Sequence, residues 1–208
     1  MGRREDKKAE KRQRIETVAL QLFLDQGYDR TSIEQIISGS DIARGTFYLY
    51  YDDKFTLFEQ LLIRWLQPLN ESFGIVQQQL QTAETPTECV QIYQEMAMSL
   101  TSIGINFSQE ILLSIREMRA NHEAGRWLRQ KEIEIQSHTR VLTEVAASRN
   151  LIDAPNPALV SLIISGAVER LYYEFLLGTQ MGDPLDLAQQ ATALLSRLLG
   201  LPFTSADA

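Results

Sequence analysis

The residues best suited to chemistry with a large polar partner lie close together in the first quarter of the chain. Arg44 carries a forked guanidinium group, Thr46 a hydroxyl and a methyl group, and Tyr48 and Tyr50 carry phenols. A guanidinium group can bind guanine O6 and N7 together, and a threonine can contact a thymine methyl group. Side chains of this kind would read bases from one face of a short helix, provided that other positions anchor that helix to a core.

The segment before these residues predicts two helices. Apolar residues recur every three or four positions in the first helix, and Gly27 stands where a left-handed residue would end it. Thr31 and Glu34 have the spacing of a capping box, which predicts a short second helix from Ser32. The apolar positions of the first helix are Ile15, Val18, Ala19, Leu22 and Phe23.

A third short helix is predicted over residues 43–51, after a turn at residues 38–41. Phe47 and Tyr51 share one face at i,i+4 and are expected in the core together with Ile42. Aspartate tolerates left-handed backbone, so Asp41 suits the turn, and we expect it to cap an early start of this helix. Two short helices joined by a turn match the helix-turn-helix pattern, although helical hairpins are also common structural units.

The remaining chain predicts a larger all-helical body. Asp52 and Asp53 should cap a helix that runs from near Lys54 to Pro68. Further helices are predicted over residues 69–81, 86–102, 108–121, 125–148, 156–179 and 184–199. We therefore expect an all-α protein, with a three-helix helix-turn-helix domain over residues 1–58 and a larger ligand-binding and dimerisation domain over residues 59–208.

The distribution of charge favours nucleic acid at one end of the chain only. The formal net charge is −7, which alone argues against binding DNA. Residues 1–14, however, hold seven basic and three acidic side chains, whereas the chain beyond residue 60 holds 10 basic and 16 acidic ones. A basic arm on an acidic body suits contact with DNA at one end, and a solvated flexible tail is the alternative.

The stretch from Thr31 to Leu62 resembles the amino-terminal DNA-binding domain of the TetR family. The matching residues are Thr31, Ile36, Ile42, Gly45, Thr46, Phe47, Tyr48 and Lys54. Departures from the family pattern are Ile37, Ser40, Asp41, Ala43, Tyr50 and Tyr51. The resemblance covers about a quarter of the chain, and it implies a dimeric, ligand-responsive transcriptional regulator, most often a repressor, that binds a palindromic operator in double-stranded DNA.

Geometry and this resemblance together assign expected DNA contacts. Gly45 would let backbone approach DNA closely, Thr31 and Ser32 would offer amides and hydroxyls to phosphate, and Lys54 would place a charge at another phosphate. The full expected set is Thr31, Ser32, Arg44, Gly45, Thr46, Tyr48, Tyr50 and Lys54. Surface decoration is the alternative for each residue taken singly.

The last two predicted helices are candidates for a homodimer interface. Residues 156–179 carry apolar side chains on two faces, which is too much for a helix with one side in water. Residues 184–199 carry a similar apolar stripe. TetR-like proteins dimerise through a four-helix bundle of their final two long helices, so we expect the same here; an intrachain core is the alternative.

Aromatic and methionine residues of the larger domain are candidates for an effector pocket. They are Trp65, Tyr93, Met96, Met98, Phe107, Met118, Trp127 and Tyr172. A small apolar or amphipathic effector would release DNA by favouring a conformer with badly spaced recognition helices. Such residues at helical spacing are more often plain core, and that reading stays open.

Other classes of protein find little support in the sequence. We expect no enzyme, because there is no phosphate-binding glycine loop and no nucleophile elbow. Glu134 and His138 at i,i+4 lack a third metal ligand, so no metal or cofactor is expected, and the lone Cys89 implies no disulfide. Without a signal peptide or an apolar span we expect a cytoplasmic location and no membrane contact. The main rival is a dimeric helical interaction protein without specific DNA binding.

Overall fold

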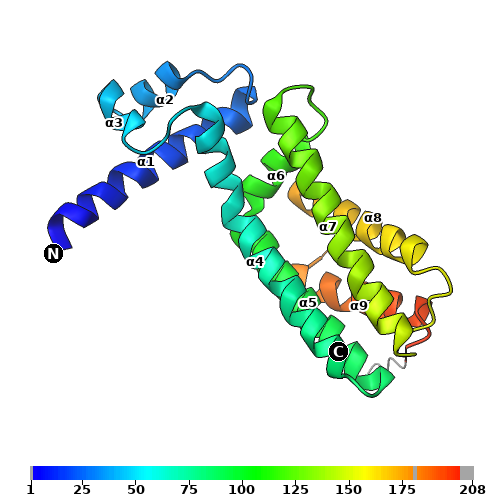
Figure 1. Cartoon of the computed structure of the whole chain (residues 1–208). Coiled ribbons are helices and arrows are strands. Elements are labelled where there is room, and N and C mark those ends of the chain that lie inside the picture. The colour runs from blue at the N-terminus through cyan, green and yellow to red at the C-terminus, as the bar shows by residue number, and fades with distance from the viewer. Residues whose placement is uncertain (1, 180–181, 202–208) are drawn as a thin grey trace. The chain divides into compact units, whose positions relative to one another are not determined.

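The computed structural model describes residues 2–179 and 182–201, and all regular secondary structure in those ranges is α-helical (Figure 1). This confirms the all-helical fold class. The helices are α1 (Gly2–Gln26), α2 (Ile33–Gly39), α3 (Arg44–Tyr48), α4 (Lys54–Thr82), α5 (Pro86–Asn106), α6 (Ser108–Glu117), α7 (Glu123–Ser148), α8 (Pro157–Leu176) and α9 (Pro184–Leu198).

Helix α1 ends where the sequence predicts. Ile15, Ala19 and Phe23 are fully buried, and Gly27 has a φ of +86°, the left-handed conformation that only glycine adopts at little cost. The basic arm is part of the same helix, since α1 begins at Gly2. Residues 5–14 of that helix are exposed, so the arm projects as a helical extension beyond the core contacts of α1.

Helix α2 begins one residue later than predicted, and its capping box is different. Ser32 is the N-cap, and its side chain accepts from the amide of Gln35, whose own side chain accepts from the Ser32 amide. The predicted box of Thr31 and Glu34 is wrong because Thr31 is buried and its hydroxyl donates to the carbonyl of Gly27 at 2.8 Å.

Helix α3 also differs from its predicted start. It begins at Arg44 with Ala43 as N-cap, and no side chain caps its first turn. The expected cap from Asp41 fails because Asp41 lies within the turn itself, with a φ of +50°. That φ nevertheless confirms that Asp41 takes the left-handed position, which aspartate tolerates better than most residues.

Helix α4 continues through Pro68, where the sequence predicts a break. A proline inside a helix removes one hydrogen bond and costs about 3 kcal/mol. The buried face of α4 keeps its register across the proline, with Leu66, Leu69 and Phe73 all buried, and this continuous packing explains why the helix persists. At its start, the Asp53 side chain accepts from the amide of Thr56 at 2.7 Å, as expected for a cap.

The later helices follow the predicted order with small changes at their ends. Helix α5 runs four residues further than predicted, α6 ends four residues earlier, and α7 begins two residues earlier. Helix α8 ends at Leu176 and is followed by Gly178, whose φ is +75°.

The chain divides into two compact units that do not coincide with a simple cut in the sequence. The first unit comprises the chain up to Trp65 together with Gln109–Gln130, and the second comprises Leu66–Ser108 and the chain from Lys131 onward. The predicted boundary at residues 58 and 59 falls within α4, and no local pattern predicts that residues 109–130 pack with the N-terminal helices.

The first unit has an aromatic core. Phe23, Tyr28 and Phe58 meet with ring centroids 5.0 to 5.6 Å apart. Leu113, Ala124 and Leu128, from α6 and α7, belong to the same buried cluster. Burial of these residues against α1 and α4 fixes the frame on which α2 and α3 are mounted.

Within the second unit, α5 packs along α9. The buried side chains of α4 beyond Leu66 and those of α5 form its core, together with Leu142 and Ala146 of α7.

Candidate nucleic-acid interface

Helix α3 is held to the first unit by one face. Phe47 is fully buried and Tyr51 is 2% exposed, which confirms their predicted place in the core. The Tyr51 hydroxyl donates to the Glu16 carboxylate of α1 at 2.7 Å. Burial and this hydrogen bond both raise the pKa of Tyr51 above its ordinary value, so the phenol keeps its proton as a donor. Helix α3 therefore has a fixed orientation on α1.

Arg44 lies on the opposite, solvent-facing side of α3. Its side chain is two-thirds exposed and forms an ion pair with Glu34 of α2 at 3.1 Å. Its guanidinium group lies 5.9 Å from the centre of the Tyr48 ring. An exposed ion pair of this kind contributes little to stability, so the guanidinium group can exchange Glu34 for another partner at small cost.

Gly45 and Tyr48 extend the exposed surface of α3. Both residues are exposed, and a Cβ atom built on Gly45 would meet no atom within 4 Å. Packing within the chain therefore does not require glycine at this position. The bare backbone leaves room for close approach of a partner, and Thr46 beside it is half-buried.

Tyr50, unlike Gly45 and Tyr48, is not an exposed residue beside α3. It is half-buried, and its hydroxyl donates to the carbonyl of Lys8 in α1 at 3.1 Å. This contact ties the segment after α3 to the basic arm, whose exposed residues include Lys7, Lys8 and Lys11.

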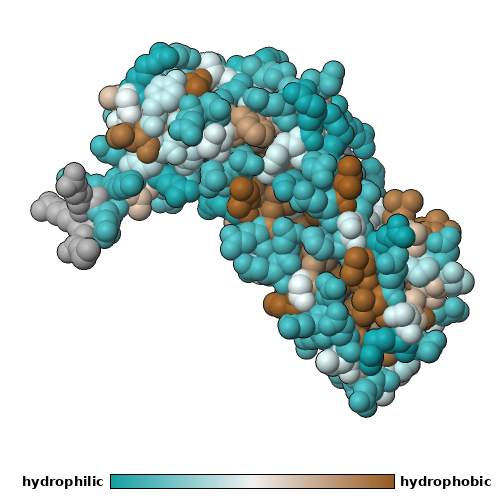
Figure 2. All heavy atoms as spheres, viewed as in Figure 1, coloured by the Kyte–Doolittle hydropathy of each residue, from teal (hydrophilic) through white to brown (hydrophobic). Residues whose placement is uncertain are grey.

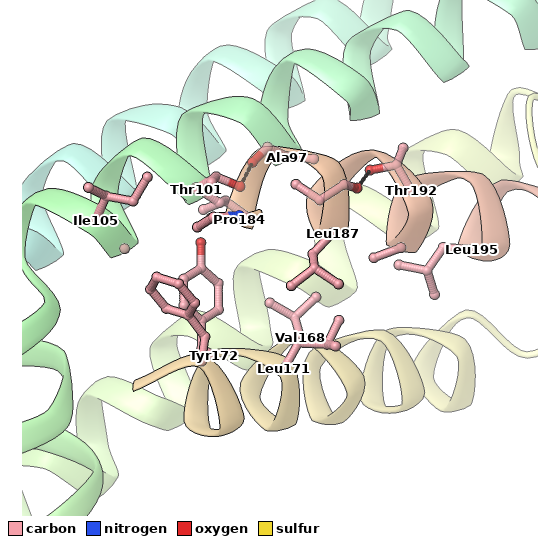
Figure 3. Close-up of a pocket in the computed structure, with 15 residues that line it drawn as sticks. Ala97, Thr101, Ile105, Val168, Leu171, Tyr172, Pro184, Leu187, Thr192 and Leu195 are labelled. Carbon is pink, nitrogen blue, oxygen red and sulfur yellow. Dashed lines mark hydrogen bonds between the residues drawn. The ribbon is translucent and has the colours of Figure 1, made fainter. Parts of the chain in front are cut away.

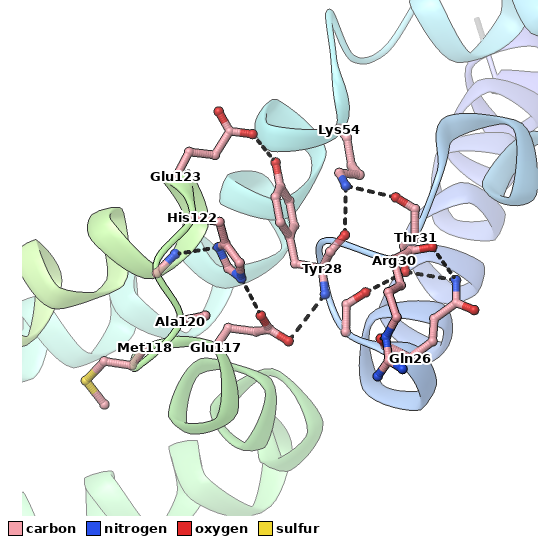
Figure 4. A network of polar contacts seen from close by, with 12 residues as sticks. Gln26, Tyr28, Arg30, Thr31, Lys54, Glu117, Met118, Ala120, His122 and Glu123 are labelled. Carbon is pink, nitrogen blue, oxygen red and sulfur yellow. Dashed lines mark hydrogen bonds and ion pairs between the residues drawn. The ribbon is translucent and has the colours of Figure 1, made fainter.

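Thr31 and Lys54, two of the expected phosphate contacts, point inward in this structure. Thr31 is 1% exposed. The Lys54 ammonium group donates to the carbonyls of Tyr28 and Thr31 at 2.7 and 2.8 Å, and burial lowers its pKa from the ordinary value (Figure 4). Ser32 is half-buried and its hydroxyl is occupied by the α2 cap. These side chains shape the turn before α2, and contact with phosphate stays a prediction for them.

A buried polar network holds the same turn from the other side (Figure 4). Glu117, at the end of α6, is 7% exposed and accepts from the Tyr28 amide at 3.3 Å. Its second carboxylate oxygen lies 2.8 Å from His122 Nε2. Because His122 Nδ1 accepts from the Gly125 amide at 3.1 Å, the ring proton lies on Nε2 and is donated to Glu117.

Two further contacts secure this network. The Tyr28 hydroxyl donates to the Glu123 carboxylate. Arg129 donates to the carbonyls of Met118 and Ala120 at 2.7 and 3.0 Å, which satisfies backbone groups after the end of α6. The sequence does not predict this network, since nothing in the pattern around residues 117–129 points toward a turn some 90 positions earlier.

The expected effector-pocket residues are spread over both units. Trp65, Met118 and Trp127 pack against the aromatic core of the first unit. Tyr93, Met96 and Phe107 are half-buried, and Met98 is exposed. Of the expected set, Tyr172 lines a cavity in the second unit, where the other lining residues come from α5, α8 and α9.

Helices α8 and α9 expose apolar side chains. Leu159, Leu162 and Ile163 of α8 are each more than half exposed, as are Leu194 and Leu198 of α9. Figure 2 shows brown surface over the part of the second unit where α8 lies in Figure 1, whereas the visible face of the first unit is mainly hydrophilic. The two apolar faces predicted for α8 are thus one half-buried face and one that no described residue covers.

The composition of the described residues bears on two other kinds of site. No three of their His, Cys, Asp and Glu side chains gather in a way that would hold a metal ion. None of their helices is both long enough and apolar enough to cross a membrane.

A small helix-turn-helix domain joined to a larger helical body is the architecture of a class of bacterial regulators. The model of the family described as bacterial regulatory proteins, tetR family, matches residues 15–61. Residues 15–61 therefore form a DNA-binding domain of the TetR family.

Two curated relatives match the chain over part of its length. The chain is 40% identical over 52 residues to the HTH-type transcriptional regulator AcrR of Shigella flexneri, which is 25% of this chain and 24% of AcrR. It is 23% identical over 122 residues to the HTH-type transcriptional repressor BepR of Brucella suis, 59% of this chain and 56% of BepR. The matches thus span about half or less of these relatives.

The fold is similar over nearly the whole chain to NalD, the secondary repressor of the MexAB-OprM multidrug efflux pump in Pseudomonas aeruginosa. The TM-score is 0.68 at 17% identity, with 91% of this chain and 96% of NalD covered. At this identity the similarity concerns the fold.

Proposed function

We propose that the protein is a transcriptional repressor that binds a palindromic DNA operator as a homodimer and is released by a small apolar or amphipathic effector. The exposed side of α3 carries this proposal. Arg44, Gly45 and Tyr48 face solvent there, while Phe47 and Tyr51 hold the helix to its core. A short helix anchored by one face and bearing an arginine on the other is suited to the major groove.

The basic arm of α1 supplies the electrostatic part of binding. Lys7, Lys8 and Lys11 are exposed on one helix, and the Tyr50 hydroxyl joins that helix to the segment after α3. Phosphate contacts from such lysines give affinity that falls steeply with salt but carries no sequence information. Arg44 would therefore provide specificity, and the arm would provide general affinity.

The exposed apolar residues of α8 and α9 support a homodimer. Leu162 and Leu194, with their exposed neighbours, form surfaces that a second copy of the chain can cover, since large uncovered apolar patches on soluble proteins mark interfaces. A twofold dimer places two copies of α3 on successive half-sites of a palindrome. Repression by the related BepR, as its name states, favours the same role here.

Fluorescence anisotropy with DNA from upstream of the protein's own gene tests the proposal. We expect tight, salt-sensitive binding by the wild type and loss of specific binding by Arg44→Ala. The matched control is Arg140→Ala, which removes an exposed arginine of α7 that pairs with Glu144. Loss of one bidentate base contact lowers specific affinity by roughly 10- to 100-fold while binding to random DNA changes little.

The rival function, a helical interaction protein, predicts a different result. A folded dimer that binds no sequence above random DNA, even after selection from a random-sequence library, would contradict the repressor proposal. Equal loss of affinity in Arg44→Ala and Arg140→Ala would contradict the role given to α3.

A further inference from the structure

The second unit contains an apolar cavity of about 120 Å³ between α5, α8 and α9 (Figure 3). Thr101 and Gly104 of α5, Tyr172 of α8, and Ala188 and Leu195 of α9 are among its lining residues. An apolar cavity of roughly 150 Å³ is enough to bind a benzene molecule. The cavity is therefore close in size to one that holds a small ring compound.

The cavity has no charged wall. None of the described residues that line it is Lys, Arg, His, Asp or Glu. An ionised ligand group would lose its hydration there without gaining an opposite charge, which is strongly unfavourable. A carboxylate or an ammonium group is thus excluded as the buried part of a ligand.

The polar side chains that line the cavity, those of Thr101, Tyr172 and Thr192, carry hydroxyl groups. The Thr101 hydroxyl donates its proton to the Ala97 carbonyl at 2.8 Å, and the Thr192 hydroxyl donates to the Ala188 carbonyl at 2.7 Å. Both protons are thereby committed to the backbone, and the two oxygens can only accept from a ligand. Burial raises the pKa of Tyr172 to about 12, so its phenol stays neutral and protonated.

Tyr172 has a fixed place in this wall. A Cβ atom built on Gly104 would lie 2.2 Å from the Tyr172 ring, so the ring rests directly on the bare backbone of α5. Figure 3 shows the Tyr172 hydroxyl directed toward α5, on the side where Thr101 lies. A ligand in the cavity would meet the Tyr172 and Thr101 hydroxyl groups together on this side, the Thr192 hydroxyl group on α9, and apolar side chains elsewhere.

We propose that the cavity binds a neutral, mainly apolar compound of about the size of a substituted benzene ring, with one hydroxyl or carbonyl group directed at Tyr172 and Thr101. This inference rests on the proposed function and narrows the effector to an uncharged class. Neutral phenols and alcohols should bind, whereas carboxylic acids with the same apolar part should not.

Isothermal titration of the full-length protein, without DNA, tests the ligand chemistry. The probes are 4-ethylphenol, ethylbenzene and 4-ethylbenzoate at pH 7. We expect saturable binding of the two neutral compounds, with 4-ethylbenzoate at least about 100-fold weaker because its carboxylate finds no partner. Equal or tighter binding of 4-ethylbenzoate, or no binding of either neutral probe, would overturn the proposal.

Two variants locate the site. Ala188→Leu fills the cavity and should abolish binding, with circular dichroism and the melting temperature showing that the protein is folded. Tyr172→Phe should weaken 4-ethylphenol about five-fold and leave ethylbenzene unchanged. Unchanged binding of both neutral probes by folded Ala188→Leu would place the site elsewhere and refute the assignment.

A parallel DNA-binding measurement separates this proposal from the function on which it rests. Binding of 4-ethylphenol that does not weaken operator binding would contradict the effector role while supporting the ligand chemistry of the cavity. Release of operator DNA by 4-ethylphenol in the wild type, but not in Ala188→Leu, would support both.

Discussion

Lys54 and Tyr28 form a single clamp on the turn between α1 and α2. The ammonium nitrogen of Lys54 lies 4.1 Å from the centre of the Tyr28 ring and donates to the carbonyl of the same residue at 2.7 Å. It also donates to the carbonyl of Thr31. The start of α4 therefore fixes the residues that lead into α2, and through α2 the position of Arg44.

Replacement of Lys54 by methionine should lower the free energy of unfolding by about 2 kcal/mol, since two backbone carbonyls lose a charged donor. Urea denaturation measures this change. The control Lys7→Met, on the exposed arm, should change stability by less than about 0.5 kcal/mol.

The same two variants distinguish two roles for Lys54, namely a structural contact with the turn before α2 and a contact with DNA phosphate. Lys7→Met should reduce the salt dependence of DNA binding by about one unit of slope, and Lys54→Met should leave that slope unchanged. A reduced slope in Lys54→Met would instead support the phosphate contact predicted from the sequence.

Glu117→Gln should destabilise the first unit by about 1–2 kcal/mol, because the buried side chain must satisfy both the Tyr28 amide and His122 with one acceptor. Glu144→Gln removes an exposed carboxylate of α7 and should cost less than about 0.5 kcal/mol. Equal effects of the two substitutions on the urea midpoint would argue against a structural role for the Glu117 network.

Gly125→Ala should lower stability by about 2 kcal/mol, since the added Cβ would lie 2.2 Å from the Ala120 carbonyl oxygen. Gly74→Ala is the matched control in α4. No atom lies within 4 Å of its added Cβ, so it should raise stability by about 0.5–1 kcal/mol through helix propensity. A neutral Gly125→Ala variant in thermal unfolding would refute the close approach at the start of α7.

Cys89 should be inert in the folded protein. It is fully buried, and burial raises its pKa from 9.0 to about 12, so the reactive thiolate is suppressed. Because the pKa of Cys89 is higher in the folded protein than in the unfolded chain, the contribution of this thiol to the free energy of unfolding is fully present below pH 9. It is lost as the pH rises toward 12.

Labelling with a thiol-specific disulfide reagent at pH 8 across a urea series checks the prediction for Cys89. Reaction should begin only as the second unit unfolds, and Cys89→Ser should show none. Rapid labelling in the absence of urea would contradict the burial of this thiol.

Leu162→Glu should weaken self-association at least about 100-fold by placing a charge in the proposed dimer interface. Met98→Glu alters an equally exposed apolar residue of α5 and should leave association unchanged. Sedimentation velocity distinguishes the two, and a wild-type protein that is monomeric at micromolar concentration would contradict the proposed homodimer.

Local signals in the sequence anticipated much of the N-terminal fold. The i,i+4 spacing of Phe47 and Tyr51 identified the buried side of α3, and the types of Gly27 and Asp41 identified two left-handed positions. These features depend on backbone preferences and on the period of the helix, both of which are determined by residues close together in the sequence.

The sequence-based predictions were wrong or incomplete where tertiary packing outweighed a local sequence preference. Pro68 signals a break, but the buried face of α4 continues on both sides of it. The Glu117 network could not be predicted, because its contact with the Tyr28 amide joins positions 89 residues apart. The cavity likewise depends on how three helices meet, and of the expected effector-pocket residues Tyr172 lies among the described residues that line it, which leaves its role a prediction.

The discontinuous first unit has a consequence for protein engineering. Since residues 109–130 share a core with the N-terminal helices, the first unit cannot be separated from the rest of the protein by a cut after α3 or α4. A chimera that joins the first unit to a different second unit would have to include residues 109–130 together with the N-terminal helices. Given the role proposed for α3, operator preference is therefore easier to exchange by substitution on α3 than by recombination of whole segments.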